Sequence, residues 1–357
     1  MPRVIGIDPG TVSIDICGLD NGRLFLDQSL PTADALRDPA AFVARLKEAG
    51  RVDLIVGPSG YGLPCMSAAD LTDDDLRLAF LAAEGEPGGI GGLRTLVRAL
   101  AHSGLPVLLT PGVIHLTSVP LHRKVNRVDM GTADKVCAAA LAVREQAERR
   151  QCSIREAAFI LLELGGAFTA AVAVEGGRIV DGIGGSSGPL GLRAAGALDG
   201  EVAFLAGSVS KSMIFTGGFQ SIRAGTDPAR SVPLNAVARA AYVEAASKAV
   251  ASLRVSATSA TEVILSGRMA RSAEVRESVS RQLHSIGSVS SVEVLGGGGV
   301  SAMQAAHGAA LLADGLAGGG EAALVEHLGI REARGTVLDH LYVISREQAR
   351  RTLGIAQ

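Results

Sequence analysis

The sequence is poor in aromatic residues and in cysteine. It has no tryptophan, three tyrosines, eight phenylalanines and four cysteines among its 357 residues. So few aromatic rings leave little surface on which nucleic-acid bases could stack. The cysteines are isolated and never form a CxxC pair, which argues against structural disulfides, zinc sites and iron–sulfur clusters. We expect each cysteine to be a small buried apolar residue.

An excess of charge of one sign is also lacking. The formal net charge is −2, and lysine and arginine are scattered along the chain. This pattern argues against a nucleic-acid platform and against an anionic membrane surface as partner. The longest apolar region, residues 157–174, is interrupted by Glu163 and two glycines, so we do not expect it to span a membrane. Because nothing near the start resembles a signal peptide, we expect a cytoplasmic protein.

Aliphatic residues are what the sequence has in quantity. Hydrophobic residues make up 47% of the chain and charged residues 20%. This composition predicts a large buried core, and the length suffices for two domains of ordinary size.

Two stretches 155 positions apart align without a gap. Residues 5–25 read IGIDPGTVSIDICGLDNGRLF, and residues 160–180 read ILLELGGAFTAAVAVEGGRIV. Each predicts an apolar strand, a turn of the form acid-x-Gly, a second strand, a tight hairpin turn and a third strand. Since Asp8 aligns with Glu163 and Gly10 with Gly165, duplication explains the pair better than two unrelated hairpins do.

Helices and strands are predicted to alternate after each triple strand. In the first half we expect helices over 39–50, 91–104 and 132–150, with strands over 52–57 and 106–110. In the second half we expect helices over 234–254, 272–287 and 301–316, with strands over 261–267 and 291–295. The chain is therefore predicted to be α/β, with two mixed sheets that carry helices on both faces. The expected units are 1–150, 151–317, and an extension of a helix and an extended tail over 318–357.

The two turns resemble the phosphate-binding loops of the superfamily of acetate and sugar kinases, heat-shock chaperones and actin. More narrowly, GIDPGTVS and ELGGAFTA are similar to the two loops of acetate and butyrate kinases. The chain is also similar to an uncharacterised family labelled as predicted butyrate kinases. This resemblance implies a duplicated actin-like (ribonuclease H-like) fold, with two βββαβαβα domains around a nucleotide cleft. It further implies ATP and Mg²⁺ as cofactors and a phosphotransferase with a small carboxylate as acceptor, and we expect a homodimer.

The first turn supplies chemistry suited to a phosphate and metal cradle, although a plain hairpin turn is the alternative. The backbone of Gly10 lets N–H groups approach phosphate oxygens, and the hydroxyls of Thr11 and Ser13 can donate to them. Asp8 is an anion, so we expect it to hold water on Mg²⁺ rather than to touch phosphate. It is therefore a candidate for both catalysis and metal binding.

The second turn and a later strand complete the predicted nucleotide site. Gly165, Gly166 and Thr169 correspond to the second phosphate loop, with Glu163 as a second acid facing Mg²⁺. The stretch VILSGRMARS resembles the adenosine-binding turn of the superfamily, which assigns Ser266 and Gly267 to the nucleotide. Gly297 and Gly298, in the run of four glycines at 296–299, are expected on the adenosine side of the cleft.

Two further residues are candidates on the acceptor side. The segment GPLGLRAAGALDGE looks like the part of the acid kinases whose arginine holds the substrate carboxylate, which makes Arg193 that residue; a solvated arginine is the alternative. Acetate-type kinases place an aspartate after the strand that corresponds to 106–110, where this chain has Thr110-Pro111-Gly112. We therefore assign Asp129 as the relocated catalytic acid, with a different chemistry as the alternative. Asp134, at the start of the helix over 132–150, is interpreted as a helix N-cap.

Two other functions stay open from the sequence. The first is an ATP-driven conformational switch without a small acceptor, as in the chaperone and actin relatives. The second is an activator ATPase that feeds electrons to a dehydratase, and the isolated cysteines argue against it.

Overall fold

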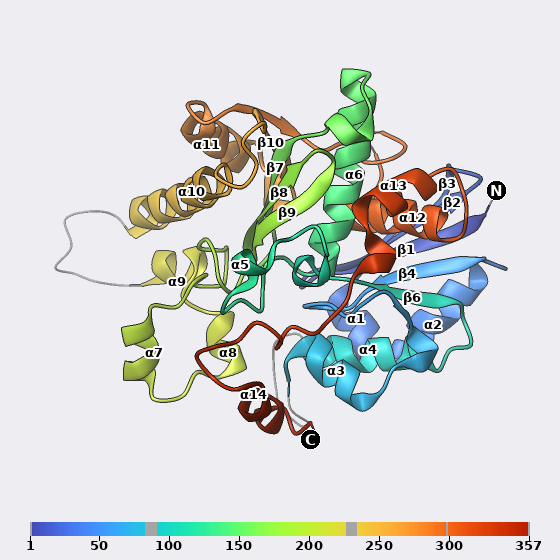
Figure 1. Ribbon diagram of the computed structural model, residues 1–357, viewed down its shortest axis with the longest axis horizontal. Coiled ribbons are helices and arrows are strands. Elements are labelled where there is room, and N and C mark those ends of the chain that lie inside the picture. Colours follow the sequence, from blue (N-terminus) through green and yellow to red (C-terminus); the bar gives the residue numbers. More distant parts are fainter. Residues whose placement is uncertain (1, 83–90, 226–233, 298, 356–357) are drawn as a thin grey trace.

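The computed structural model describes residues 2–82, 91–225, 234–297 and 299–355, which form two β-sheets covered by helices (Figure 1). The first sheet has the order β3-β2-β1-β4-β6-β5 and the second has the order β11-β10-β7-β8-β9. The strands of the first sheet are β1 (Arg3–Pro9), β2 (Ser13–Asp20), β3 (Arg23–Pro31), β4 (Leu54–Pro58), β5 (Met66–Ser67) and β6 (Val107–Thr110). Those of the second sheet are β7 (Phe159–Leu164), β8 (Thr169–Glu175), β9 (Arg178–Ile183), β10 (Glu262–Ser266) and β11 (Ser288–Ser291).

The helices divide into those before β7 and those after it. The first group is α1 (Thr32–Arg37), α2 (Pro39–Glu48), α3 (Asp73–Phe80), α4 (Gly91–Ala101), α5 (Leu121–Lys124) and α6 (Ala133–Arg150). The second group is α7 (Gly200–Ala206), α8 (Lys211–Ile214), α9 (Phe219–Ala224), α10 (Leu234–Leu253), α11 (Ala273–Leu283), α12 (Gln304–Leu316), α13 (Ala322–Leu328) and α14 (Arg346–Thr352). Among the helices of the described residues, none is both long and apolar enough to cross a membrane.

The internal repeat of the sequence is present in the backbone. In each half an antiparallel three-stranded meander is followed by two strands parallel to its first strand. The hairpin turns coincide as well, because Asn21 and Gly22 have φ of 52° and 74°, and Gly176 and Gly177 have φ of 58° and 70°. Two successive residues at positive φ are what a two-residue hairpin turn matched to the strand twist requires.

An irregularity in the strands is repeated at the same offset. The pairing of β2 with β3 shifts register between Gly18 and Leu19, and the pairing of β8 with β9 shifts between Ala173 and Val174. Bulges are features that evolution retains rather than random defects. Their occurrence at equivalent positions therefore supports duplication independently of residue identity.

The last long helix of each half packs on the sheet of the other half. Helix α6 contacts β7 and β8, whereas α12 contacts β1, β2, β4 and α6. Figure 1 shows α6 running between the two sheets and α12 lying beside the first of them. Side chains on β7 alternate between two cores: Ile160 and Leu162 pack towards α10, and Phe159 and Leu161 pack in the core that contains α6 and α12. Burial on both faces explains why the strand reads as a continuous apolar run.

Most predicted elements are present, with one strand misplaced. The strand predicted over 291–295 is wrong, because β11 covers Ser288–Ser291. Parallel pairing of Glu262 with Ser288 sets this register, and the Glu262 carboxylate also accepts a hydrogen bond from Ser290 Oγ at 2.6 Å. This tertiary contact overrides the higher strand propensity of the valines that follow. The extension holds two helices, α13 and α14, rather than the single helix predicted.

Candidate functional site

The two acid-glycine turns face each other across one cavity. Asp8 and Glu163 both line it, as expected from their equivalent positions in the repeat. The turns approach so closely that a Cβ on Gly166 would lie 2.9 Å from Val12 Cγ2 and 3.5 Å from Thr11 Oγ1. The wall of the cavity draws on both halves, with Tyr61, Phe80, Leu93, Asp129, Lys135, Phe168, Ser266, Gly267, Arg268 and Gln304 among its residues.

A glycine is needed at the same point of each turn. A Cβ on Gly10 would lie 2.9 Å from the carbonyl oxygen of Ser13, and a Cβ on Gly165 would lie 2.7 Å from that of Phe168. Real Cβ atoms do not approach a backbone oxygen so closely, so only glycine fits without a backbone shift. The first turn is also fixed by Thr32, whose Oγ1 donates to the Gly10 carbonyl at 2.7 Å.

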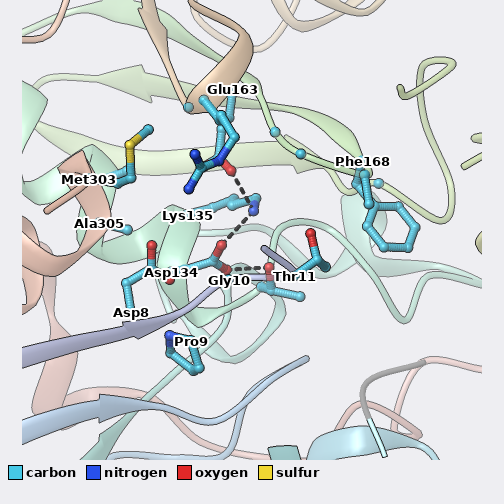
Figure 2. Close-up of a pocket in the computed structure, with 18 of the residues that line it drawn as sticks. Asp8, Pro9, Gly10, Thr11, Asp134, Lys135, Glu163, Phe168, Met303 and Ala305 are labelled. Atoms are coloured by element: carbon cyan, nitrogen blue, oxygen red, sulfur yellow. Dashed lines mark hydrogen bonds and ion pairs between the residues drawn. The ribbon is translucent and has the colours of Figure 1, made fainter. Parts of the chain in front are cut away.

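A buried lysine joins the two halves at the cavity wall. Lys135 lies in the first turn of α6, and its Nζ is 2.5 Å from Asp134 Oδ2 and 2.8 Å from Glu163 Oε1 at the end of β7. Figure 2 shows the ammonium group between the two carboxylates. Burial alone would lower the pKa of Lys135, but the charges of Asp134 and Glu163 outweigh it and the pKa is raised. Lys135 is therefore held as a cation.

The acids around Lys135 differ in their electrostatic environment. Burial raises the pKa of Asp8 well above its ordinary value, and the charges of Asp134, Asp15 and Glu163 raise it further. Burial also raises the pKa of Glu163, against the attraction of Lys135. For Asp134 burial is outweighed by Lys135 and by hydrogen bonds from Lys135 and Thr132, so its pKa is lowered. Asp8 is thus the carboxylate whose ionised form most needs an added cation.

The acids of the cavity differ in how well they could bind a metal ion. Within the described ranges, no group of three or more His, Cys, Asp or Glu side chains is arranged to hold a metal ion. Mg²⁺ is commonly bound by only one or two carboxylates together with waters and substrate phosphates, so Asp8 fits such a role. Glu163 fits it less well, because Lys135 already neutralises its carboxylate.

The hydroxyl of Ser13 is engaged on both sides. Its Oγ donates to Asp15 Oδ2 at 3.1 Å and accepts a hydrogen bond from Arg268 Nη2 at 2.7 Å. Because a serine hydroxyl carries a single proton, this proton is directed at Asp15 in the present structure. The hydroxyl of Thr11, by contrast, lies on an exposed residue at the cavity wall.

The predicted adenosine turn lies at the cavity, next to the second glycine turn. Ser266 pairs with Glu163 across β10 and β7, and its buried Oγ has no hydrogen-bond partner in the described part of the chain. Gly267 has φ of +89°, and a Cβ there would lie 2.6 Å from the carbonyl oxygen of Leu164. Both facts favour glycine at this position. The Gly267 amide also faces Gln304 Oε1 at 3.4 Å.

Asp129 lies at the cavity, but its carboxylate is already occupied by hydrogen bonds. Its Oδ1 accepts from the Gly131 amide at 3.1 Å, and its Oδ2 accepts from the amide and the hydroxyl of Ser186, each at 2.9 Å. These donors belong to opposite halves of the chain. Asp129 therefore connects the segment before α6 to the segment after β9.

Three predicted residues of the described part of the chain, Thr169, Arg193 and Gly297, are not brought to this cavity. Thr169 is fully buried and Arg193 is exposed, and neither lines the cavity. The Arg193 amide nevertheless donates to the Ala167 carbonyl in the second turn at 3.0 Å. Gly297 has open space where a Cβ would stand and lies outside the cavity wall, and Gly298 falls outside the described residues.

Two residues of the cavity wall are not predicted from the sequence, and a third has a different role from the predicted one. The sequence does not assign Lys135 or Arg268 to the site. Lys135 lies in the first turn of the helix between the halves, and Arg268 directly follows the glycine of the adenosine turn. The assignment of Asp134 as N-cap is wrong, because Thr132 occupies that position. Asp134 lies two positions after the N-cap, as the second residue of the helix, where its carboxylate pairs with Lys135.

Residues 6–343 match a family model described as protein of unknown function (DUF1464). The chain belongs to this family. No curated protein matches the sequence. The description of the family carries no activity, so the similarity to the predicted butyrate kinases stays a prediction.

Solved structures of acid kinases share the fold. The acetate kinase of Entamoeba histolytica is 10% identical, with a TM-score of 0.57 over 80% of this chain and 87% of that chain. The propionate kinase of Francisella tularensis is 13% identical, with a TM-score of 0.57 over 80% and 89%. The acetate kinase of Porphyromonas gingivalis is 12% identical, with a TM-score of 0.53 over 80% and 88%. The predicted duplicated actin-like fold is thereby confirmed.

Proposed function

We propose that the protein is an ATP- and Mg²⁺-dependent phosphotransferase that acts on a small carboxylate. The observation that carries this proposal is the meeting of two glycine turns, one from each repeated meander, across a single cavity. Backbone N–H groups of such turns are suited to phosphate oxygens. Phosphoryl transfer depends mainly on positioning and on charge neutralisation, which two opposed turns can provide.

Mg²⁺ would be held through Asp8. When bound, the ion neutralises charge on the phosphate oxygens and lowers the barrier to transfer. The buried Asp8 carboxylate has three other acids nearby and a single lysine, so an added cation stabilises its ionised form. Lys135 holds Glu163 in place and keeps the two turns in register.

The base and ribose would lie towards Ser266 and Gly267. The unpartnered Ser266 hydroxyl can exchange a hydrogen bond with the nucleotide, and Gly267 lets it approach the backbone. The Gly267 amide faces Gln304, which lies between Met303 and Ala305 in the sequence. Figure 2 shows Met303 and Ala305 on one side of Lys135 and Phe168 on the other. The acceptor would therefore enter from the side of Phe168.

Arg193 is proposed as the arginine that orients the acceptor carboxylate. It does not line the cavity, but it lies on the segment whose backbone is hydrogen-bonded to the second turn, and the residue is exposed. Asp129 acts on the same side as a positioning carboxylate, through Ser186. The three solved structures described above with a TM-score above 0.5 are acetate and propionate kinases, so the conformational-switch alternative is not favoured. We also propose that the chain divides into the units 1–150, 151–317 and 318–357, and that the protein forms a homodimer.

The dependence of nucleotide binding on Mg²⁺ is the first test. In the variant Asp8→Asn, Mg²⁺ should no longer strengthen ATP binding, because the anionic ligand is removed. The same variant should raise the stability of the ligand-free protein, since it removes a buried carboxylate whose ionisation is costly. Calorimetry with and without Mg²⁺, and urea unfolding, measure the two effects. Asp34→Asn, an exposed acid on α1, is the control. Equal ATP affinity with and without Mg²⁺ in the native protein contradicts the proposal.

The acceptor is tested through Arg193. Two parallel hydrogen bonds from a guanidinium to a carboxylate are not reproduced by lysine. Arg193→Lys should leave ATP affinity unchanged and lower acceptor-dependent turnover roughly tenfold to hundredfold. The assay supplies ATP and a panel of short carboxylates, and hydroxylamine traps any acyl phosphate. If no carboxylate raises ADP release above background, the acid-kinase assignment is wrong and a slow acceptor-independent ATPase replaces it.

A further inference from the structure

Acids outnumber bases at the cavity wall. Among the described residues that line it, the carboxylates are those of Asp8, Asp15, Asp129, Asp134 and Glu163, whereas the cations are Lys135 and Arg268. The Lys135 ammonium is already shared by two carboxylates. A polyphosphate brings further negative charge into this environment, so its binding needs positive charge that is not already neutralised.

Among the described residues, Arg268 is the cation at this wall without a direct ion pair, although its charge attracts the nearby Asp15 carboxylate. Within the described residues it forms no ion pair, and its side chain makes one hydrogen bond, to the neutral hydroxyl of Ser13. A guanidinium has five N–H donors in a planar fork, so most of its donors are not used by that contact. The residue is exposed to the solvent of the cleft, which leaves the remaining donors open to an incoming ligand.

The position of Arg268 connects the two halves of the site. It begins the 3₁₀ turn Arg268–Arg271, directly after Gly267 of the adenosine turn, and reaches Ser13 on the far side of the cleft. Ser13 in turn donates to Asp15, whose other carboxylate oxygen is buried and has no hydrogen-bond partner among the described residues. The Ser13 hydroxyl, which the sequence assigns to phosphate, thus donates to Asp15 instead. Beside it, Arg268 has the N–H groups that can donate to phosphate oxygens.

We propose that Arg268 contacts the polyphosphate of the nucleotide from the second half of the molecule. This inference rests on the proposed function and names a residue that binds the phosphate groups of the nucleotide. The guanidinium lies between the turn that receives the nucleoside and the first glycine turn, and two of its N–H groups can bind phosphate bidentately. Because Ser13 and Arg268 lie in different halves, their hydrogen bond connects the two halves at this site.

The chain offers a matched control three residues away. Arg271 lies in the same 3₁₀ turn and is exposed, but its Nη2 donates to the Ala302 carbonyl at 3.2 Å and it does not line the cavity. The two glutamine variants, Arg268→Gln and Arg271→Gln, remove the same charge from the same element. Their difference therefore isolates the effect of the cavity contact.

Calorimetry with Mg²⁺ compares ATP and adenosine as ligands of these variants. Arg268→Gln should weaken ATP binding roughly tenfold to hundredfold and leave adenosine binding unchanged, because adenosine has no phosphate. Arg268→Lys should recover part of the loss, since it restores charge without the fork. Arg271→Gln should bind both ligands as the native protein does. Thermal unfolding shows whether each variant is folded.

The outcomes separate the inference from the function on which it rests. If the native protein binds ATP with Mg²⁺ but Arg268→Gln binds it equally well, the assignment of Arg268 is overturned and the proposed function stands. If Arg268→Gln weakens ATP and adenosine by the same factor, Arg268 only holds the fold of the adenosine turn, and the assignment also fails. If the native protein binds no nucleotide, both proposals fail.

Discussion

At the residue scale, Lys135 neutralises two of the five acids that line the cavity, Asp134 and Glu163. Its side chain is 12% exposed and meets carboxylates that are 22% and 13% exposed. A buried ion pair adds little net stability when it is complete, because desolvation of the charges offsets their attraction. Removing one partner is costly, since the other charge stays buried and unpaired.

The variant Lys135→Met is therefore expected to destabilise the protein by about 3–5 kcal/mol. The double variant Lys135→Met with Glu163→Gln should recover much of this loss, because the unpaired charge is removed with its partner. Urea unfolding of the two variants and of Glu163→Gln alone measures the coupling. Additive effects of the two substitutions would show that the ion pair does not connect the halves.

At the scale of elements, the site depends on close backbone approaches of α12. Gly308 on this helix meets α6, where a Cβ would lie 1.8 Å from the carbonyl oxygen of Cys137. Gly6 on β1 meets the same helix, where a Cβ would lie 2.1 Å from the amide nitrogen of Ala310. These two glycines place α12 between the first sheet and the helix that carries Lys135. The wall of the cavity formed by Met303, Gln304 and Ala305 is fixed by that packing.

The variant Gly308→Ala should destabilise the fold by about 1–3 kcal/mol, although alanine is the better helix former. The added methyl group cannot be accommodated unless α12 moves away from α6. Gly200→Ala is the control, because Gly200 lies in α7 and has no atom within 4 Å of the added Cβ. Chemical denaturation of both variants compares them, and equal stability would mean that the two helices separate at no cost.

At the scale of the whole molecule, duplication explains why a cleft exists at all. The two sheets share the order of five strands, to which the first sheet adds β5 at its edge, and they present equivalent turns. The last long helix of each half packs on the sheet of the other half. The larger hydrophobic core runs from the first sheet through α6 and α12 to residues of the second sheet. Helices α6 and α12 hold the two halves together, and this packing lets the two acid-glycine turns face each other across the cavity.

The features that depend on short stretches of the chain can be predicted from the sequence. The meander, its positive-φ turns and the glycine of each acid-glycine turn follow from short-range sterics, which a stretch of about ten residues already contains. The repeat then placed Asp8 and Glu163 at equivalent positions, and the structure puts both at one cavity.

Which charges meet depends on the packing of the two halves. Ser13 and Arg268 are 255 residues apart in sequence, and Lys135 reaches Glu163 on a strand of the other half. The tertiary structure also put Arg193 outside the cavity and directed the Ser13 proton at Asp15. Contacts of this kind depend on how two sheets are brought together by buried helices, and the preference of a residue for helix, strand or turn carries no information about a partner across a cleft.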